Sequence, residues 1–363
     1  MGSAEVIDYA AAAPRAKGLP KPAPKAQPGQ KIAVVSPSFA APGYGPEVHK
    51  QAMHRLVELT GMEVKEYPTT RVIGSSPQDR ARDLNDAFAD PEIGAVMATI
   101  GGSDQITVIP HVDQSLIASS PKPFIGYSDN THLHNLLWNL GVCSFYGGST
   151  QVHIGAGPAI DDVHAASLLA AVRDGGELEL TNPPLSEDYG FDWKEERSLT
   201  ETGVRRPAEP WTWSGPTKTV AAQTWGGCVQ VIQEIIWAGR FTNFDLLDGK
   251  ILILEGSEDI IEPIAYADFM RALGERGLLS RIAGLVVSRF PATSFTFNPS
   301  EEDQAAYRRS IRDISHGVME KYGPQAVVCV GPPFGHTRPQ WIVPYGGKMR
   351  LDRASENLFA SYD

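Results

Sequence analysis

The stretch "KPFIGYSDNTHLHNLLW", residues 122–138, decides the fold of the first half of the chain. It begins as an apolar strand, passes through a short polar turn that contains Ser128, and continues as a helix. Such a turn resembles a nucleophile elbow, where a sharp bend exposes a serine hydroxyl. It is also typical of a helix start, because Ser, Asp and Asn are preferred N-caps. Taken alone, the stretch favours the cap, since Asn130 replaces the second glycine of G-x-S-x-G.

Strand-like and helix-like segments alternate around this stretch. Apolar runs typical of buried strands are "KIAVVSPS", "MEVKEYP", "IGAVMATIGG" and "CSFYGG", and helical patterns follow the first two. This alternation indicates βαβ units and a parallel sheet. Ligands bind such sheets beyond the carboxyl ends of the strands, which is where the turns "TIGGSDQ" and "GYSDNT" fall. We therefore expect a site at these turns.

Composition divides the chain into four segments. Residues 1–30 are rich in Ala, Pro and Lys, which predicts a flexible tail outside the fold. Residues 31–180 form the α/β module that carries Ser128, and residues 218–363 form a second module of apolar strands and amphipathic helices. Between them, residues 181–217 are rich in Pro, Trp and charge. A connecting segment of this length is expected to be functional or mobile.

Several classes of protein are disfavoured by composition. A formal net charge of −11 argues against binding to a nucleic acid polymer. The 3 cysteines lie far apart without metal-ligand spacing, which indicates a reducing, cytoplasmic compartment and no metal centre. No apolar run reaches the roughly 18 residues of a membrane span, and no phosphate-binding glycine motif occurs. We expect neither a membrane interaction nor a cofactor.

A serine nucleophile needs a base, and the base needs an acid that orients it. His336 lies in the turn "GPPFGHTRPQ" after an apolar strand, and Glu255 ends the strand "KILILE". A carboxylate at the end of so apolar a strand is costly to bury unless it is paired. The alternative for His336 is a loop histidine without a role. Glu258, Asp259 and Glu262 follow Glu255 within one turn and are interpreted as solvated or capping acids. His132 and His134, on the helix after Ser128, are more typical of ordinary helix positions.

Two further features could contact a ligand. The pair Gly101-Gly102 lets the backbone approach closely, so its N–H groups could stabilise an oxyanion, or the pair could simply form a tight turn. The connecting segment holds Trp193, Trp211 and Trp213. Such residues either stack on a flat ligand or bury at the junction between modules.

In order and spacing these motifs resemble the LD-carboxypeptidase family of serine peptidases. The resemblance rests on "ATIGG", "FIGYSDNTHLHNLLWNLGVCSFYGG", "AAQTWGGCVQVI", "ILILEGSE" and "FGHTRPQWIVPYG", and it runs from about residue 31 to about residue 352. The branch typified by the microcin C immunity peptidase is the most similar. The family implies an N-terminal parallel-sheet domain, flavodoxin-like or class I glutamine amidotransferase-like, that carries the serine. It also implies a C-terminal mixed α/β domain, with a small β-barrel-like sheet, that carries the acid and the base.

The resemblance also implies roles for individual residues. The catalytic triad falls on Ser128, Glu255 and His336. The backbone N–H groups of Asp129 and of one glycine of the pair, either Gly101 or Gly102 and assigned here to Gly102, are implied as oxyanion donors. Substrate contacts are implied at Gly101, Ser103 and Trp193. The Asp129 side chain is expected to cap the following helix. Here "SDQ" follows the glycines where the branch carries other residues, and "PATSFTFNPSEEDQAAYRR" is longer than usual, so substrate contacts should differ from those of the branch.

Function follows from the same resemblance. It predicts a serine amidase that cleaves peptidyl- or aminoacyl-nucleotides of the microcin C type and so provides self-immunity or detoxification. The alternative is a muropeptide substrate, from which a terminal D-amino acid is released. A homodimer is implied as well. A binding protein that only sequesters its ligand is a third reading, whereas a glutamine amidotransferase would require cysteine at position 128.

Overall fold

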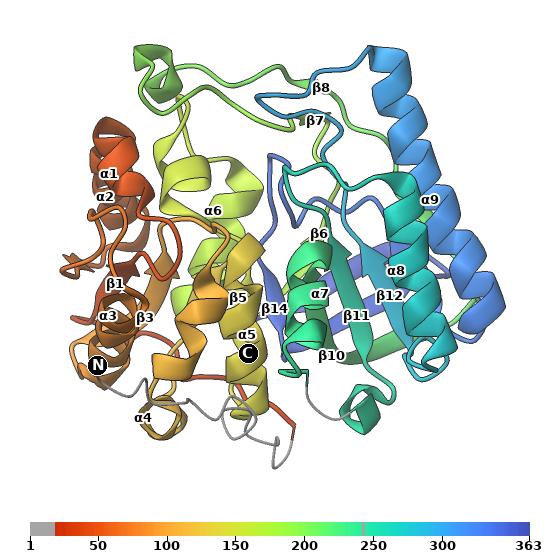
Figure 1. Ribbon diagram of the computed structural model, residues 1–363, viewed down its shortest axis with the longest axis horizontal. Coiled ribbons are helices and arrows are strands. Elements are labelled where there is room, and N and C mark those ends of the chain that lie inside the picture. Colours follow the sequence, from red (N-terminus) through yellow and green to blue (C-terminus); the bar gives the residue numbers. More distant parts are fainter. Residues whose placement is uncertain (1–18, 242–243) are drawn as a thin grey trace, which may run out of the picture.

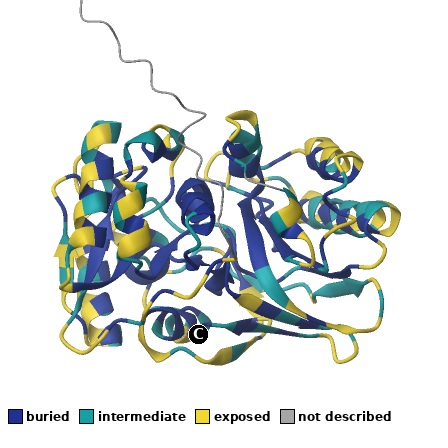
Figure 2. Ribbon diagram, turned by 90° about the horizontal axis from the view of Figure 1, so that it is seen from below, coloured by how far each residue is buried: buried dark blue, intermediate teal, exposed yellow. Residues whose placement is uncertain are grey.

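The computed structural model describes residues 19–241 and 244–363. Two mixed α/β halves lie side by side, each built on its own sheet (Figure 1). The interior strands and the helices between the sheets are buried, whereas the outer helices expose one face to solvent (Figure 2). The predicted two-part α/β architecture is confirmed.

The N-terminal sheet has the order β14-β5-β4-β3-β1-β2. Strands β1 to β5 are mutually parallel, and β14 pairs antiparallel with β5. The strands are β1 (Lys31–Val35), β2 (Val64–Glu66), β3 (Ile93–Ala98), β4 (Phe124–Gly126), β5 (Ser144–Tyr146) and β14 (Val343–Tyr345). Its helices are α1 (Ala41–Tyr44), α2 (Pro46–Thr60), α3 (Pro77–Ala89), α4 (Gln114–Ser119), α5 (Thr131–Asn139) and α6 (Asp162–Leu169).

Both faces of this sheet are covered, as expected for a parallel sheet. Along β1, Ile32 and Val34 enter one hydrophobic cluster, while Ala33 and Val35 enter another. Successive side chains of a strand point to opposite faces, so the two clusters are the two sides of the sheet. This explains why its strands are apolar without alternation in sequence.

The second sheet has eight strands, in the order β6-β16-β15-β10-β11-β12-β13-β9, and is larger than the small barrel-like sheet expected from the resemblance. Its centre, β10 to β13, is parallel, and antiparallel strands flank it on both sides. The strands are β6 (Glu177–Leu180), β9 (Thr212–Ser214), β10 (Thr219–Cys228), β11 (Ile251–Glu255), β12 (Gly284–Val287), β13 (Val327–Val330), β15 (Lys348–Asp352) and β16 (Asn357–Ser361). The helices are α7 (Val229–Trp237), α8 (Pro263–Glu275) and α9 (Glu301–Tyr322).

The two halves exchange strands, so the sheets do not divide at the predicted boundaries. β6 precedes residue 181 but pairs with β16 in the second sheet. β14 comes from the C-terminal segment but completes the N-terminal sheet. Within the connecting segment, β9 joins the second sheet, and β7 (Leu185–Ser186) pairs with β8 (Arg206–Pro207) near the top of Figure 1.

Residues 19–30 do not lie outside the fold, which corrects part of the predicted tail. Lys21 forms backbone hydrogen bonds with both Gly141 and Cys143, and Ala23 and Ala26 are buried. This segment therefore runs along the N-terminal half as an ordered arm. The prediction for residues 1–18 lies outside the described residues.

Helix ends agree with the sequence at two places and differ at a third. Gly61 ends α2 in the left-handed conformation, with φ 69°, and Ser76 caps α3 by accepting a hydrogen bond from the Asp79 N–H. The expected cap by Asp129 is wrong, because no side chain caps α5. No described helix is both long and apolar enough to cross a membrane.

Candidate active site

Ser128 occupies a strained turn between β4 and α5. Its φ of 64° lies in the left-handed region, which is uncommon for residues other than glycine. A short 3₁₀ turn, Ser128–Asn130, joins the strand to the helix. The Ser128 N–H donates to the Tyr146 hydroxyl over 3.0 Å, and the Ser128 side chain caps no helix. The geometry therefore favours the elbow interpretation of this turn over the cap.

Glu255 lies at the carboxyl end of β11 and is completely buried. Its two carboxylate oxygens have different partners: Oε1 accepts from the Tyr146 hydroxyl at 2.6 Å, and Oε2 lies 2.6 Å from Nδ1 of His336. Burial and the charge of Glu255 raise the pKa of Tyr146 well above its usual range, so this hydroxyl stays protonated as a donor. The buried carboxylate is thus paired on both sides, as its position requires.

His336 lies between two carboxylates. Besides the Glu255 contact, its Nε2 lies 2.9 Å from Oε2 of Glu258. The ring is buried and packs edge-on against Tyr127, with the centroids 4.7 Å apart. Burial disfavours the charged ring, but the charges of Glu255 and Glu258 outweigh that effect and raise the pKa of His336 to about 10. Among the described residues, no hydrogen bond joins His336 to Ser128.

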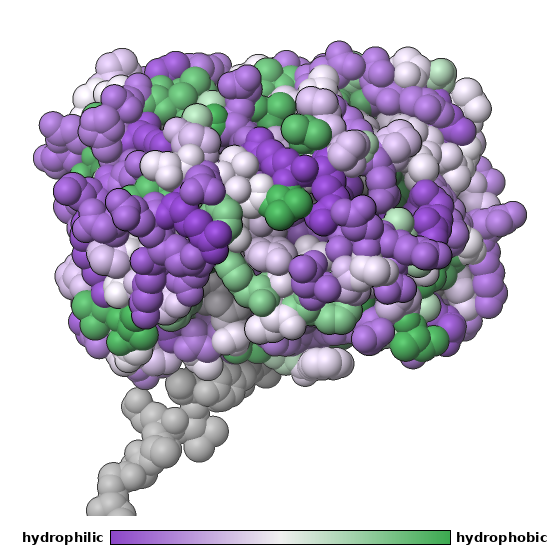
Figure 3. Space-filling model, turned by 90° about the horizontal axis from the view of Figure 1, so that it is seen from above, coloured by the Kyte–Doolittle hydropathy of each residue, from purple (hydrophilic) through white to green (hydrophobic). Residues whose placement is uncertain are grey.

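Ser128 and His336 line one cavity of about 410 Å³ beside the connecting segment. Gly101, Gly102 and Trp193, for which substrate or oxyanion contacts are predicted, line it as well. Ser103 is exposed and does not line it, so the predicted contact at Ser103 is not supported. Much of the wall is aromatic: Phe39, Tyr127, Tyr189, Phe191, Trp193 and Phe295. Figure 3 shows the face that carries the connecting segment, where hydrophobic side chains lie scattered among hydrophilic ones.

The glycine pair lies directly against the serine. A Cβ atom at Gly101 would come within 2.7 Å of Cβ and 2.9 Å of Oγ of Ser128, so no other residue fits there. Gly102 has a φ of 154° and its backbone also passes close to Ser38. Neither the Gly102 N–H nor the Asp129 N–H donates a hydrogen bond within the described part of the chain. Gly102 lines the cavity, whereas Asp129 is buried and does not line it; the Asp129 N–H lies next to Gly101, which does.

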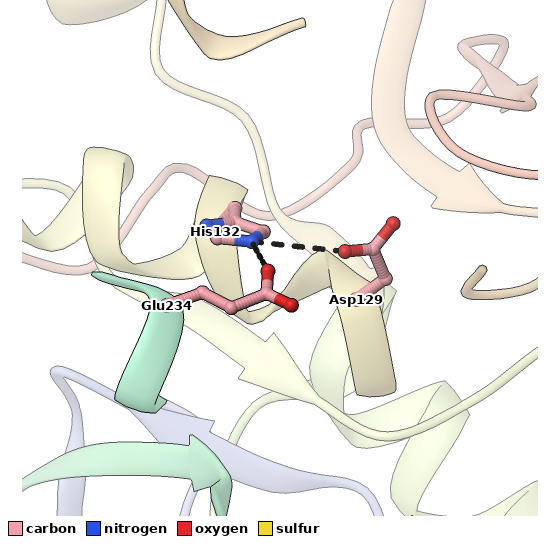
Figure 4. A group of neighbouring side chains, drawn as sticks. All are labelled: Asp129, His132 and Glu234. Carbon is pink, nitrogen blue, oxygen red and sulfur yellow. Dashed lines mark hydrogen bonds and ion pairs between the residues drawn. The ribbon is translucent and has the colours of Figure 1, made fainter. Parts of the chain in front are cut away.

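A second cluster of acids around a histidine lies next to Ser128 (Figure 4). His132 Nε2 lies 3.1 Å from Glu234 on α7 and 3.7 Å from Asp129. Ligand atoms of these three residues lie within 4.8 Å of one another, which is compatible with a metal ion. Oδ2 of Asp129 accepts hydrogen bonds from the Ser38 hydroxyl and the Gln105 N–H, and Oδ1 is the oxygen that faces His132. The contacts of His132 with the two acids join the two halves of the molecule.

Sequence reasoning missed two residues at this site. Tyr146 links the Ser128 backbone to Glu255, and Glu258, interpreted as a solvated or capping acid, contacts His336. A signal existed for Tyr146, since "CSFYGG" ends a strand at the sheet edge that carries Ser128. The connection after β12 is the segment that is longer than usual in the family, and its Phe295 lines the cavity. Trp211 and Trp213 pack against the hydrophobic core, as their alternative interpretation expected.

Several known proteins are similar to this chain in sequence. A putative carboxypeptidase, YocD, from Bacillus subtilis is 30% identical over 351 residues, covering 92% of this chain and 96% of its own. The microcin C7 self-immunity protein MccF from Escherichia coli is 25% identical over 284 residues, which is 77% of each chain. A probable murein peptide carboxypeptidase from Bacillus subtilis is 26% identical over 340 residues, which is 90% of each chain.

Solved structures share the fold. MccF in complex with aspartyl sulfamoyl adenosine matches with a TM-score of 0.78 and 20% identity, over 95% of this chain and 98% of that one. An MccF-like protein from Streptococcus pneumoniae in complex with AMP matches with a TM-score of 0.77 and 22% identity, over 92% and 99%. Family models for the LD-carboxypeptidase N-terminal and C-terminal domains match residues 32–147 and 221–351. Since these matches span more than half of its residues, the chain belongs to the LD-carboxypeptidase family of peptidases.

Proposed function

We propose that the chain is a serine amidase in which Ser128 is the nucleophile, His336 the base and Glu255 the acid that orients the base. The observation that carries this proposal is the strained turn of Ser128, which shares a cavity with His336. Glu255 holds Nδ1 of that histidine and leaves Nε2 directed away from the buried carboxylate. A nucleophile, a base and an orienting acid are the parts that acyl transfer requires.

In the proposed reaction, Nε2 of His336 takes the proton from Ser128 Oγ as the oxygen attacks the carbonyl carbon of the amide. The histidine then gives this proton to the departing amine, and an acyl ester remains on Ser128. Water, deprotonated by His336, hydrolyses the ester and restores the serine. Glu255 fixes the tautomer of the ring and stabilises the imidazolium. Tyr146 keeps the second oxygen of Glu255 paired throughout.

The developing oxyanion needs donors that are in place before the reaction. We assign this role to the backbone N–H groups of Asp129 and Gly102, which have no acceptor within the described chain. The contact of Gly101 with Ser128 brings the glycine turn to the required place. Loss of one such donor typically costs about 3 kcal/mol of transition-state stabilisation.

We infer that the substrate is a peptidyl- or aminoacyl-nucleotide, cleaved at the amide that joins the amino acid to the nucleotide. The aromatic wall of the cavity supports this choice, because aromatic side chains stack well on a flat base. Trp193, whose ring lies edge-on to Tyr44 at 6.3 Å, is the candidate for the stacking contact. MccF, a relative of this chain, has been solved with aspartyl sulfamoyl adenosine.

A muropeptide is the second candidate. The observation that favours it is the similarity to the probable murein peptide carboxypeptidase, which extends over 90% of both chains. In that case the enzyme releases a terminal D-amino acid, and the leaving amine is that amino acid. The homodimer and the cytoplasmic location remain predictions from sequence.

One assay separates these substrates and tests the serine. The purified protein and a Ser128→Ala variant are incubated with aspartyl sulfamoyl adenosine and, separately, with a muropeptide tetrapeptide. Mass spectrometry then detects released sulfamoyl adenosine or D-alanine. We expect nucleoside release by the wild type and none by the variant. Turnover by Ser128→Ala at the wild-type rate would refute the nucleophile, and hydrolysis of the muropeptide alone would refute the nucleotide substrate.

A further inference from the structure

The Glu258 carboxylate contacts the His336 nitrogen that the proposed reaction uses as its base. Its Oε2 lies 2.9 Å from Nε2, the nitrogen that must accept the proton of Ser128. The residue follows β11 on an exposed loop, and its side chain is 66% accessible to solvent, so it is free to move. Without substrate, the base is therefore held by a carboxylate instead of by the serine hydroxyl.

Arginines neutralise only part of the negative charge on this side of the cavity, and the cation next to Glu258 is the His336 ring itself. Four acids line the cavity: Glu187, Asp188, Glu258 and Asp259. The first two form ion pairs with arginines, which are Arg205, Arg289, Arg308 and Arg338. In the described part of the chain no lysine or arginine pairs with Glu258 or Asp259. A ligand that brings a positive charge to this place would give Glu258 a cationic partner other than His336.

We propose, on the basis of the proposed function, that Glu258 binds the free α-ammonium group of an aminoacyl substrate and so selects aminoacyl over peptidyl substrates. The α-nitrogen is two bonds from the carbonyl carbon that Ser128 attacks. It therefore lies near Nε2 of His336 when the substrate is in place, and within reach of the carboxylate that rests on Nε2. An acylated α-nitrogen carries no charge and therefore cannot draw the Glu258 carboxylate away from Nε2 of His336.

Substrate binding also frees the base in this scheme. When Glu258 turns from Nε2 to the ammonium group, His336 loses one of the two anions that raise its pKa. The proton on Nε2 then passes to water, and the neutral ring faces Ser128. The ammonium group thus contributes both affinity and activation, whereas a peptidyl substrate meets a protonated base.

The test compares alanyl sulfamoyl adenosine with its N-acetylalanyl counterpart, which differs only in the charge on the α-nitrogen. For the wild type we expect kcat/KM to favour the free amine by roughly 10- to 150-fold, the range for a hydrogen bond to a charged group. In Glu258→Gln this ratio falls close to one, because kcat/KM falls for the free-amine substrate and rises for the acetylated one. Glu262→Gln is the matched control: it removes an exposed acid outside the cavity and keeps the wild-type ratio.

The same compounds give a reading that does not depend on turnover. Titration calorimetry with Ser128→Ala should show tighter binding of the free amine, and adding Glu258→Gln should remove the difference. If the wild type hydrolyses neither compound, the proposed function fails for this substrate class, while calorimetry still decides the role of Glu258. Equal binding of both compounds, or a preference that survives Glu258→Gln, would overturn the inference.

Discussion

Two clusters in this molecule place a histidine between two acids, and they begin at neighbouring residues. His336 lies between Glu255 and Glu258, beside Ser128, and His132 lies between Asp129 and Glu234 (Figure 4). The first cluster lies within the C-terminal half, whereas the second joins Asp129 and His132 of the N-terminal half to Glu234 of the other. Each cluster therefore consists of one histidine and two carboxylates.

Their surroundings differ. His336 lines a cavity together with a serine in a strained turn, whereas neither His132 nor Asp129 lines it. Asp129 also accepts two hydrogen bonds from within its own domain, and burial raises the pKa of its carboxyl group. An acid–histidine pair thus becomes a candidate for chemistry only where a nucleophile and a cavity accompany it. The second cluster serves to hold α5 against α7.

Exchanging each histidine for alanine gives the largest expected contrast. His336→Ala should lower kcat/KM by about 10⁴- to 10⁶-fold, because the proposed base is lost. His132→Ala should lower it less than about tenfold, because only an ion pair next to the site is lost. Steady-state kinetics on the substrate proposed above measure both, with circular dichroism to verify folding. A folded His132→Ala as inactive as His336→Ala would end the distinction between the clusters.

Removing one hydroxyl tests how Glu255 is held. Tyr146→Phe keeps the ring in the core but leaves Oε1 of Glu255 without its donor. A hydrogen bond to a charged group is worth about 1.5–3 kcal/mol, so kcat should fall roughly 10- to 150-fold with little change in KM. Tyr345→Phe is a matched control, since this hydroxyl is also buried but forms no hydrogen bond with Glu255 or Ser128 in the described structure. An unchanged kcat in Tyr146→Phe would show that the Tyr146 hydroxyl does not contribute to catalysis.

The pH dependence of the free enzyme should move when one acid of the first cluster is neutralised. His336 acts only when neutral, so kcat/KM for a neutral substrate rises as pH rises through its pKa, which is raised to about 10. Glu258→Gln removes one of the two anions that cause this, so the rise should move to lower pH. Other groups near the ring, Glu255, Tyr127 and His153, are unchanged. A rise that stays in place would show that Glu258 does not control the base.

The smallest effect is expected in the second cluster. Glu234 is partly exposed, and its ion pair with His132 spans the two halves of the molecule. Glu234→Gln should lower the free energy of unfolding by less than about 1 kcal/mol, the usual value of an exposed ion pair, and leave kcat/KM unchanged. Urea denaturation and kinetics measure the two quantities. A large loss of activity with normal stability would mean that this cluster takes part in the reaction.

Sequence predicted the strands and the ends at which the candidate site lies, because apolar runs and glycine turns are local signals. It also singled out Ser128, Glu255 and His336, which the structure brings to one edge between the two halves. Contacts made across the fold were not predictable in this way. Tyr146 reaches Glu255 across 109 positions of sequence, and the Asp129 side chain turns to Ser38 instead of its own helix. The alternation of strands and helices also could not reveal that β6 and β14 each pair within the sheet of the other half.

The exchange of β14 has a consequence for how the protein is made. Until residue 345 has left the ribosome, β5 has an unpaired edge in the sheet that carries Ser128, and such edges invite pairing with other chains. His336 emerges only nine positions earlier, so the proposed base and the final strand of the Ser128 sheet become available almost together, long after Ser128 itself. A nascent chain therefore carries no complete site while its first sheet is still open. Fragments cut at residue 217 would keep the serine but lack the strand that closes its sheet, and should associate with one another instead of remaining stable alone.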